Sequence, residues 1–235
     1  MPNLATRIAE NQRQVRERID AAAVLSGRTG ADIQLVAVTK YVGPAEIRAV
    51  VAAGCTELGE SRPQQLWERA AALADLPVRW HFIGHLQRNK VRRTLPLAAL
   101  IHSVDSPRLA EAIEESAAEL SLHVPVLLEL NVSGEAAKGG FEPEEIERAL
   151  PRLAGLSHLE IRGLMCMAAL EGGLDIARRN FADLRLLRDR LRASCPENIG
   201  LDELSMGMSG DYEVAIEEGA TIVRVGSALF EGIGG

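Results

Sequence analysis

The sequence predicts a single (β/α)8 barrel, and three observations support this fold class. The chain has 235 residues, which suits one barrel of about 250 residues. Eight short apolar runs alternate with longer stretches that carry apolar residues at helical spacing. A doubly wound sheet more often has about five or six strands and a phosphate-binding loop after the first, whereas the incomplete glycine motif here, Gly207 to Gly210, lies late in the chain. We therefore expect one domain spanning residues 1–235.

The predicted elements follow in order, and proline at helix starts and glycine at helix ends mark several boundaries. An extra helix from Leu4 to Leu25, ended by Gly27, precedes the first strand. The predicted strands are Ile33 to Lys40, Thr56 to Gly59, Arg79 to Gly84, Leu100 to Val104, Val124 to Val132, Leu159 to Met167, Glu203 to Met206 and Thr221 to Gly226. The predicted helices run from Pro44 to Gly54, onward from Pro63, Pro107 and Pro143, from Leu174 to Cys195 and from Ser209 to Glu218, with a short helix after the last strand.

Composition excludes several classes of protein. The 26 basic and 33 acidic residues give a formal net charge of −7, so a basic surface for nucleic acid is not expected. The three cysteines form no C-x-x-C pair, which excludes a disulfide framework or cysteine zinc site and suits a reducing cytosol. The first residues lack the apolar segment of a signal peptide, and no run approaches the length of a membrane helix. We expect a soluble, cytoplasmic protein without a membrane or nucleic-acid partner.

Lys40 is the first candidate for chemistry. Functional groups of a (β/α)8 barrel gather at the carboxyl ends of its strands. Alternation places Val36, Val38 and Lys40 on one side of the first strand. If that row faces inward, Lys40 points into the barrel mouth, where partial desolvation favours the neutral amine that attacks an aldehyde. The alternative is that Lys40 merely ends the strand and reaches water.

Two loops late in the chain form a candidate anion site. Ser205 to Gly210 joins the seventh strand to a helix, and Gly226-Ser227 follows the eighth strand. In such barrels these two loops commonly bind phosphate through backbone N–H groups, hydroxyls and the positive end of a helix dipole. The alternative is ordinary N-capping by Ser209 and a tight turn at Gly226.

Arg224 adds a third group to this end of the barrel. It lies on the same side of the eighth strand as Ile222, and the eighth strand adjoins the first when the barrel closes. Adjacent cations at Lys40 and Arg224 are costly unless an anionic ligand lies between them. A lysine for an aldehyde, an anion site for a phosphate and an arginine for a ring nitrogen together describe pyridoxal 5′-phosphate (PLP).

Other candidates are weaker. His81 and His85 lie on one side of the third strand and could bind a metal, but hydrogen bonding is the favoured role because no further ligand has matching spacing. Lys138, in a glycine-rich loop, could contact a ligand or simply be solvated. The methionines at positions 165, 167, 206 and 208 are interpreted as packing around the barrel end.

A series of motifs runs through nearly the whole chain. They are Val36-Ala-Val-Thr-Lys40, Gly59-Glu60, His81-Phe-Ile-Gly-His-Leu-Gln-Arg-Asn-Lys90, Asn131-Val-Ser-Gly134 with Lys138-Gly139, Arg162-Gly-Leu-Met165, Leu204-Ser-Met-Gly-Met-Ser209 and Val223-Arg-Val-Gly226. In this order they resemble the YggS/PROSC-type PLP-binding proteins, also called pyridoxal phosphate homeostasis proteins. Two positions depart from the family pattern: Ser61 stands where asparagine is common, and Ala137 stands where serine commonly precedes the loop lysine.

The resemblance implies specific roles. It implies a barrel like the N-terminal domain of alanine racemase, PLP held as a Schiff base on Lys40, and Arg224 facing the pyridine nitrogen. It implies that the phosphate is bound by Ser209, Gly226 and Ser227, and Met206 from the same motif is counted with the cofactor-binding residues. No metal is expected. The implied role is in vitamin B6 supply and amino-acid balance, without established catalysis.

Three functions are therefore compared. The leading one is a protein that stores PLP or delivers it to apo PLP-dependent enzymes. The second is a PLP-dependent amino-acid racemase, which needs two bases, commonly lysine and tyrosine. Tyr41 is predicted to point away from Lys40, Tyr212 belongs to the helix behind the phosphate loop, and no second domain is expected to supply another tyrosine. The third is a Schiff-base aldolase without PLP, which leaves Arg224 unexplained.

Overall fold

The computed structural model describes residues 3–135 and 139–233, and its parallel strands close into one barrel in the order β1 to β8. The strands are β1 (Gln34–Val38), β2 (Glu57–Glu60), β3 (Arg79–Phe82), β4 (Ala98–Val104), β5 (Val124–Leu130), β6 (Leu159–Cys166), β7 (Glu203–Ser205) and β8 (Ile222–Val225). Pairing of β8 with β1 completes the barrel and sets Val36 opposite Arg224. The predicted fold class and the order of its strands are confirmed.

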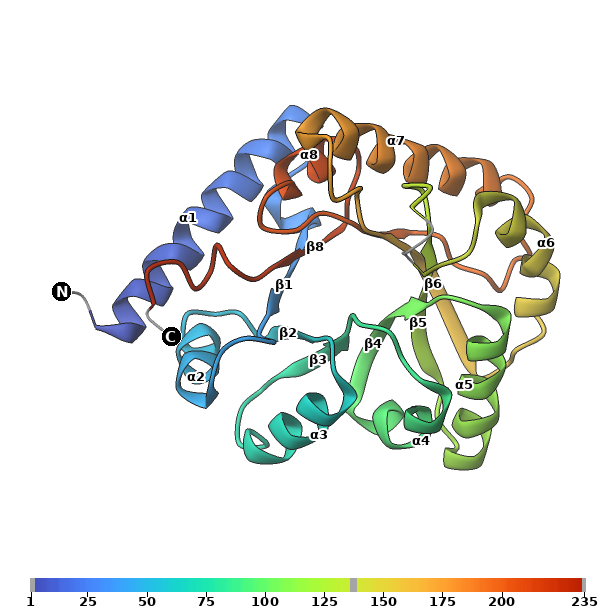
Figure 1. The fold of residues 1–235 in the computed structure, drawn as a ribbon, viewed down its shortest axis with the longest axis horizontal. Helices are drawn as coiled ribbons and strands as arrows, with labels where there is room; N and C mark the ends of the chain where they lie inside the picture. Colours follow the sequence, from blue (N-terminus) through green and yellow to red (C-terminus); the bar gives the residue numbers. More distant parts are fainter. Residues whose placement is uncertain (1–2, 136–138, 234–235) are drawn as a thin grey trace.

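The helices form a ring outside the strands (Figure 1). They are α1 (Leu4–Leu25), α2 (Pro44–Ala52), α3 (Pro63–Ala72), α4 (Val91–Thr94), α5 (Pro107–Leu120), α6 (Pro143–Leu153), α7 (Gly173–Arg192) and α8 (Tyr212–Glu217). Proline opens α2, α3, α5 and α6, as predicted, because its fixed φ suits the first helical turn. The extra helix α1 packs against α2 and α8 and so covers the outside of the barrel where β8 meets β1 (Figure 1).

Alternation along the strands separates two cores. Outward-facing residues pack against the helices in a large apolar core. Inward-facing residues form a small apolar cluster inside the barrel, made of Val36, Leu100, Leu127, Met165 and Ile222. Other inward positions are polar although they are buried, namely His81, His102, Ser205 and Arg224. A polar barrel interior calls for hydrogen-bond partners, because a buried polar group without one is costly.

Two elements differ from the prediction. The link between β3 and β4 contains the short helix α4 between 3-10 turns at Arg88–Lys90 and Leu95–Leu97, pieces too short to show apolar periodicity. The short helix predicted after β8 is wrong, since the described residues there form turns up to Gly232. The reason lies in α1, where the Asn11 side chain donates hydrogen bonds to the carbonyls of Leu229 (3.1 Å) and Glu231 (3.0 Å).

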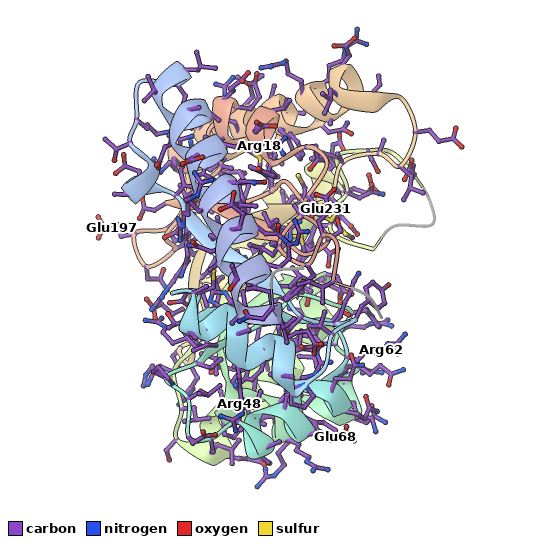
Figure 2. All side chains as sticks on the ribbon, turned by 90° about the vertical axis from the view of Figure 1, so that its left-hand side faces the viewer. Arg18, Arg48, Arg62, Glu68, Glu197 and Glu231 are labelled. Carbon is purple, nitrogen blue, oxygen red and sulfur yellow. The ribbon has the colours of Figure 1, made fainter. Side chains whose placement is uncertain are left out.

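The two ends of the barrel lie on opposite sides of the molecule. Figure 2 shows Glu197, which precedes β7, at one edge, and Arg62, which follows β2, at the opposite edge. In the part of the chain that the structure describes, neither α1, α7 nor any shorter helix combines the length and apolar character needed to cross a bilayer.

Candidate functional site

A cavity of about 940 Å³ lies at the carboxyl ends of the strands. Of the residues predicted to form the site, the cavity lining includes Lys40, Ser209, Arg224, Gly226 and Ser227. Met206 does not line it; this side chain is fully buried in the outer core. Alternation explains the difference, because Ser205 faces the interior and the next residue must face outward.

Lys40 follows β1 in a turn that a buried ion pair holds from outside the barrel. The Arg69 guanidinium of α3 donates to the carbonyls of Thr39 (2.8 Å) and Val42 (2.7 Å). It also pairs with the carboxylate of Glu60, which accepts a hydrogen bond from the Thr39 hydroxyl as well. The Glu60 side chain is fully buried, and this burial raises its pKa despite the neighbouring cations. The turn that presents Lys40 to the cavity is therefore fixed from behind.

Tyr41 departs from its predicted position. The prediction required the strand to continue, but β1 ends at Val38 and the Val42 N–H closes a turn on the Thr39 carbonyl at 3.0 Å. As a result the Lys40 ammonium lies 4.9 Å from the centroid of the Tyr41 ring. Tyr41 stands at the rim of the cavity with 84% of its surface exposed.

Arg224 lines the cavity from within the barrel. Its guanidinium donates to Ser205 Oγ at 2.6 Å and to the Cys166 carbonyl at 2.8 Å. The residue is only 3% exposed, and burial lowers the pKa of its guanidinium. The predicted inward rows of β1 and β8 are thus confirmed, and they bring both cations to one cavity.

The anion site is built differently from the prediction. The helix α8 begins at Tyr212 with Asp211 as its N-cap, so Ser209 does not cap it, and the loop after β8 leads into no helix within the residues described up to 233. Ser209 Oγ instead accepts hydrogen bonds from the N–H groups of Gly226 (3.0 Å) and Ala228 (3.4 Å) and joins the two loops.

The two loops after β7 and β8, which Ser209 joins, keep backbone N–H groups without a hydrogen-bond partner among the described residues. Among the described residues, the backbone N–H groups of Ser209, Gly210 and Ser227 donate no hydrogen bond. Because Ser209 Oγ uses both lone pairs, its own proton is also free to donate. A Cβ atom on Gly226 would lie 3.3 Å from the Val38 carbonyl, so glycine lets the β8 loop approach β1. The arrangement can bind an oxyanion without any contribution from a helix dipole.

The two histidines of β3 and its loop do not form a pair. His81 is buried and contacts His102 (2.8 Å) and Glu57 (2.7 Å) within the barrel. His85 lies in the cavity, 3.0 Å from the Asp105 carboxylate. No group of three potential metal ligands occurs within residues 3–135 and 139–233.

Sequence reasoning missed an acidic side of the cavity. Glu129 of β5 and Asp105 after β4 both line it. Burial, followed by the nearby charge of Asp105, raises the pKa of Glu129 to about 7. The alternation of Leu127 and Glu129 along β5 could have indicated an inward carboxylate.

Of the two positions that depart from the family pattern, Ser61 and Ala137, the structure describes only Ser61. Ser61 lines the cavity, and a Cβ atom on Gly84 would lie only 2.1 Å from its carbonyl oxygen, so glycine is needed for the loops after β2 and β3 to meet. Ala137 and the candidate Lys138 lie outside the described residues.

Comparison with known proteins identifies relatives over the whole described fold. The family model for the alanine racemase N-terminal domain matches residues 6–233. A pyridoxal phosphate homeostasis protein from Aquifex aeolicus is 41% identical over 94% of this chain and 96% of its own length. PipY of Synechococcus elongatus, solved with PLP bound, is 36% identical, with a TM-score of 0.84 over 95% of this chain and 99% of that chain.

A more distant structure shares the fold alone. Alanine racemase from Streptomyces coelicolor is 20% identical, with a TM-score of 0.72 over 96% of this chain and 58% of that chain. The family match, the identity to the Aquifex protein and the coverage of both chains agree with the motifs of the site. This chain therefore belongs to the alanine racemase N-terminal domain family and, within it, to the pyridoxal phosphate homeostasis proteins.

Proposed function

We propose that this protein binds PLP in the cavity at the carboxyl ends of the strands and serves PLP homeostasis without catalysing amino-acid chemistry. One observation carries the proposal: the Lys40 amine, the Arg224 guanidinium and the unpaired N–H groups of the β7 and β8 loops converge on one cavity. The names of the relatives and the PLP-bound structure of PipY support it.

The donor set fits the three functional groups of PLP. Lys40 has no carboxylate within ion-pair distance among the described residues, so its amine is available to an aldehyde. Arg224 uses N–H groups on Ser205 and the Cys166 carbonyl, and a guanidinium with five N–H donors keeps others for a ring nitrogen. The free N–H groups beside Ser209 and Ser227 suit a phosphate.

Each residue then has a distinct task. Lys40 would hold the cofactor covalently, by condensation of its amine with the aldehyde and loss of one water. Arg224 would donate to the pyridine nitrogen and, as a permanent cation, would disfavour protonation of that nitrogen. Ser209 and Ser227 would donate to the phosphate, and Gly226 would leave space for it. When bound, PLP supplies an electron-withdrawing ring, and an unprotonated nitrogen weakens that property.

Among the described residues, neither tyrosine is held as a second base, which argues against a racemase of the lysine-and-tyrosine kind. Tyr212 is 1% exposed and lies outside the cavity lining. Tyr41 is at the rim but 84% exposed, and no hydrogen bond from a described residue orients its hydroxyl. General base catalysis requires a base held within hydrogen-bond reach of the proton. The open rim beside Lys40 instead suits exchange of PLP with apo-enzymes in the cytoplasm.

Titration and exchange experiments test the proposal. Adding PLP to the purified protein should produce the visible absorbance band of lysine-bound PLP, and borohydride should fix one cofactor per chain. Holo-protein incubated with L- and D-amino acids in deuterated water should leave the α-proton signals unchanged by NMR, and it should activate an added apo PLP-dependent enzyme. Lack of the band would overturn attachment of PLP to a lysine, and α-proton loss at several turnovers per second would favour the racemase.

A further inference from the structure

A row of hydrogen bonds crosses the barrel interior beneath Arg224. Arg224 Nη1 lies 2.6 Å from Ser205 Oγ, and Ser205 Oγ lies 2.8 Å from His102 Nδ1. His102 Nε2 lies 2.8 Å from His81 Nδ1, and His81 Nε2 lies 2.7 Å from Glu57 Oε2. We call Ser205, His102, His81 and Glu57 the interior chain.

The interior chain joins the two ends of the barrel. Arg224 lines the cavity at the carboxyl ends of the strands, whereas Glu57 lines a separate cavity of about 360 Å³ that also includes Gln34 and Thr221. Ser205 and His102 are fully buried and His81 is 1% exposed, while the Glu57 side chain is 19% exposed. The interior chain is therefore shielded from water except at its Glu57 end.

Chemistry at the two ends sets the direction of the hydrogen bonds. A guanidinium has no acceptor, so Ser205 Oγ must accept from Arg224, and an ionised carboxylate has no donor, so His81 Nε2 must donate to Glu57. Burial, with a smaller effect of the Arg224 charge, holds the pKa of His102 well below its usual range. Although burial opposes ionisation, the hydrogen bond from His81 and the charge of Arg79 lower the pKa of Glu57.

With His102 neutral, its single ring proton can lie on either of two nitrogens. If the proton is on Nε2, His102 donates to His81, Ser205 donates to His102 Nδ1, and all four bonds run from Arg224 towards Glu57. If it is on Nδ1, His102 donates back to Ser205, and His81 must carry two protons to satisfy both His102 and Glu57. The second arrangement leaves the proton of the fully buried Ser205 hydroxyl without an acceptor in this row, because Arg224 and His102 both donate to its oxygen. An unsatisfied buried donor is costly, so the first arrangement is favoured.

We propose that the interior chain is a positioning device in which four hydrogen bonds run one way from Arg224 to Glu57, with His102 and His81 each protonated at Nε2. Its task is to fix the Arg224 guanidinium so that the remaining donors face the cavity. The role of Arg224 toward a cofactor ring nitrogen rests on the proposed function. The direction of the hydrogen bonds in the interior chain does not. Ser205, His102, His81 and Glu57 thereby become positioning residues that never touch the ligand.

The cofactor-free protein tests the direction of the chain. Long-range proton–nitrogen NMR spectra distinguish the two tautomers of a neutral histidine, and both His102 and His81 should be protonated at Nε2. Glu57→Gln keeps an acceptor oxygen for His81, so both histidines should stay protonated at Nε2. Glu57→Leu removes this acceptor, so each histidine should become a mixture of its two tautomers. A His102 proton on Nδ1 in the wild-type protein overturns the proposal, whether or not the leucine variant folds.

The PLP-loaded protein tests the positioning of Arg224. Ser205→Ala removes one of the two acceptors that anchor Arg224. The less well positioned guanidinium should raise the dissociation constant for PLP about tenfold, which corresponds to about 1.4 kcal/mol. The absorbance maximum of bound PLP should also shift, while borohydride still fixes it to Lys40. Glu57→Gln should shift the maximum in the same direction but less.

Glu203→Gln is the matched control for Glu57→Gln. Glu203 lines the same amino-end cavity but bonds to the Thr221 hydroxyl rather than to the interior chain, so its loss of charge should leave the PLP spectrum unchanged. Equal shifts in both glutamine variants, or a Ser205→Ala protein with a wild-type spectrum and affinity, would overturn the positioning role. Failure of the wild-type protein to bind PLP would instead overturn the proposed function. The NMR result on the cofactor-free protein would still decide the direction of the hydrogen bonds in the interior chain.

Discussion

Arg69 donates a hydrogen bond of 2.8 Å to the backbone carbonyl of Thr39, the residue directly before Lys40. Arg69 belongs to α3 and reaches Lys40's turn from outside the barrel, where it also pairs with the buried Glu60. The lysine in the cavity and the arginine behind it are therefore separated by the barrel wall. Stability and cofactor attachment should depend on the same ion pair.

Replacing Arg69 with methionine should destabilise the protein by about 3–5 kcal/mol, because it leaves the buried Glu60 carboxylate without its cation. The double variant with Glu60→Gln should recover part of this loss, since a neutral amide costs less to bury. Urea unfolding of the cofactor-free proteins measures both effects. Arg48→Met is the control: Arg48 pairs with Asp75 at the surface, where solvent screens the pair, so its loss should leave the urea midpoint almost unchanged. Equal losses for the two arginines would contradict the role of the buried pair.

Lys40→Ala should remove covalent attachment of PLP while leaving a weaker, reversible complex held by the anion site and Arg224. The visible band of lysine-bound PLP should disappear, and mass spectrometry after borohydride should find no cofactor on the chain. Lys90→Ala is a suitable control, because Lys90 stacks on the Trp67 ring, 5.8 Å from its centroid, and does not line the cavity. Full borohydride fixation in the Lys40 variant would show that another lysine carries the cofactor.

Features that depend on local periodicity could be predicted from the sequence. The inward rows that end in Lys40 and Arg224 follow from the two-residue repeat of a strand, and the closure of an eight-stranded barrel makes β8 the neighbour of β1. Proline at position 44 and at the three other helix starts likewise acts through its own φ angle. These predictions needed no knowledge of distant contacts.

Features that depend on distant partners could not be predicted. The loop after β8 fails to form a helix because Asn11, at the other end of the chain, bonds to its carbonyls. Ser209 bonds to Gly226 and Ala228 rather than to its own helix, and spacing alone does not distinguish these choices. Alternation along β5 could have placed Glu129 inside the barrel, but its raised pKa could not be predicted, because it arises from burial and from Asp105 in the loop after β4.

The raised pKa of Glu129 predicts a specific pH dependence of stability. A carboxyl whose pKa rises from 4.5 to about 7 on folding binds its proton more tightly in the folded state, so its contribution to stability is lost as pH rises through that window. Glu129→Gln should therefore stabilise the cofactor-free protein at pH 8 relative to pH 5, by at most about 3 kcal/mol, since one pKa unit corresponds to about 1.4 kcal/mol. Urea midpoints at the two pH values measure this, with exposed Glu68→Gln as control. The same change in both variants would argue against a buried, protonated Glu129.

Ser209 makes two contributions to the anion site, as an acceptor that joins two loops and as a donor to the phosphate, and a single substitution separates them. Ser209→Asp retains an acceptor for the N–H groups of Gly226 and Ala228, so the two loops should stay joined, but it adds a negative charge where the phosphate is proposed to bind. Two like charges near a protein surface repel by up to about 4 kcal/mol at contact distance, so the affinity for PLP should fall at least about 100-fold. The affinity for pyridoxal, which has no phosphate, should change little. Fluorescence titration with both ligands measures the ratio, and Ser194→Asp, at an exposed position after α7, controls for the added net charge. An equal loss of affinity for PLP and pyridoxal would mean that the phosphate binds elsewhere.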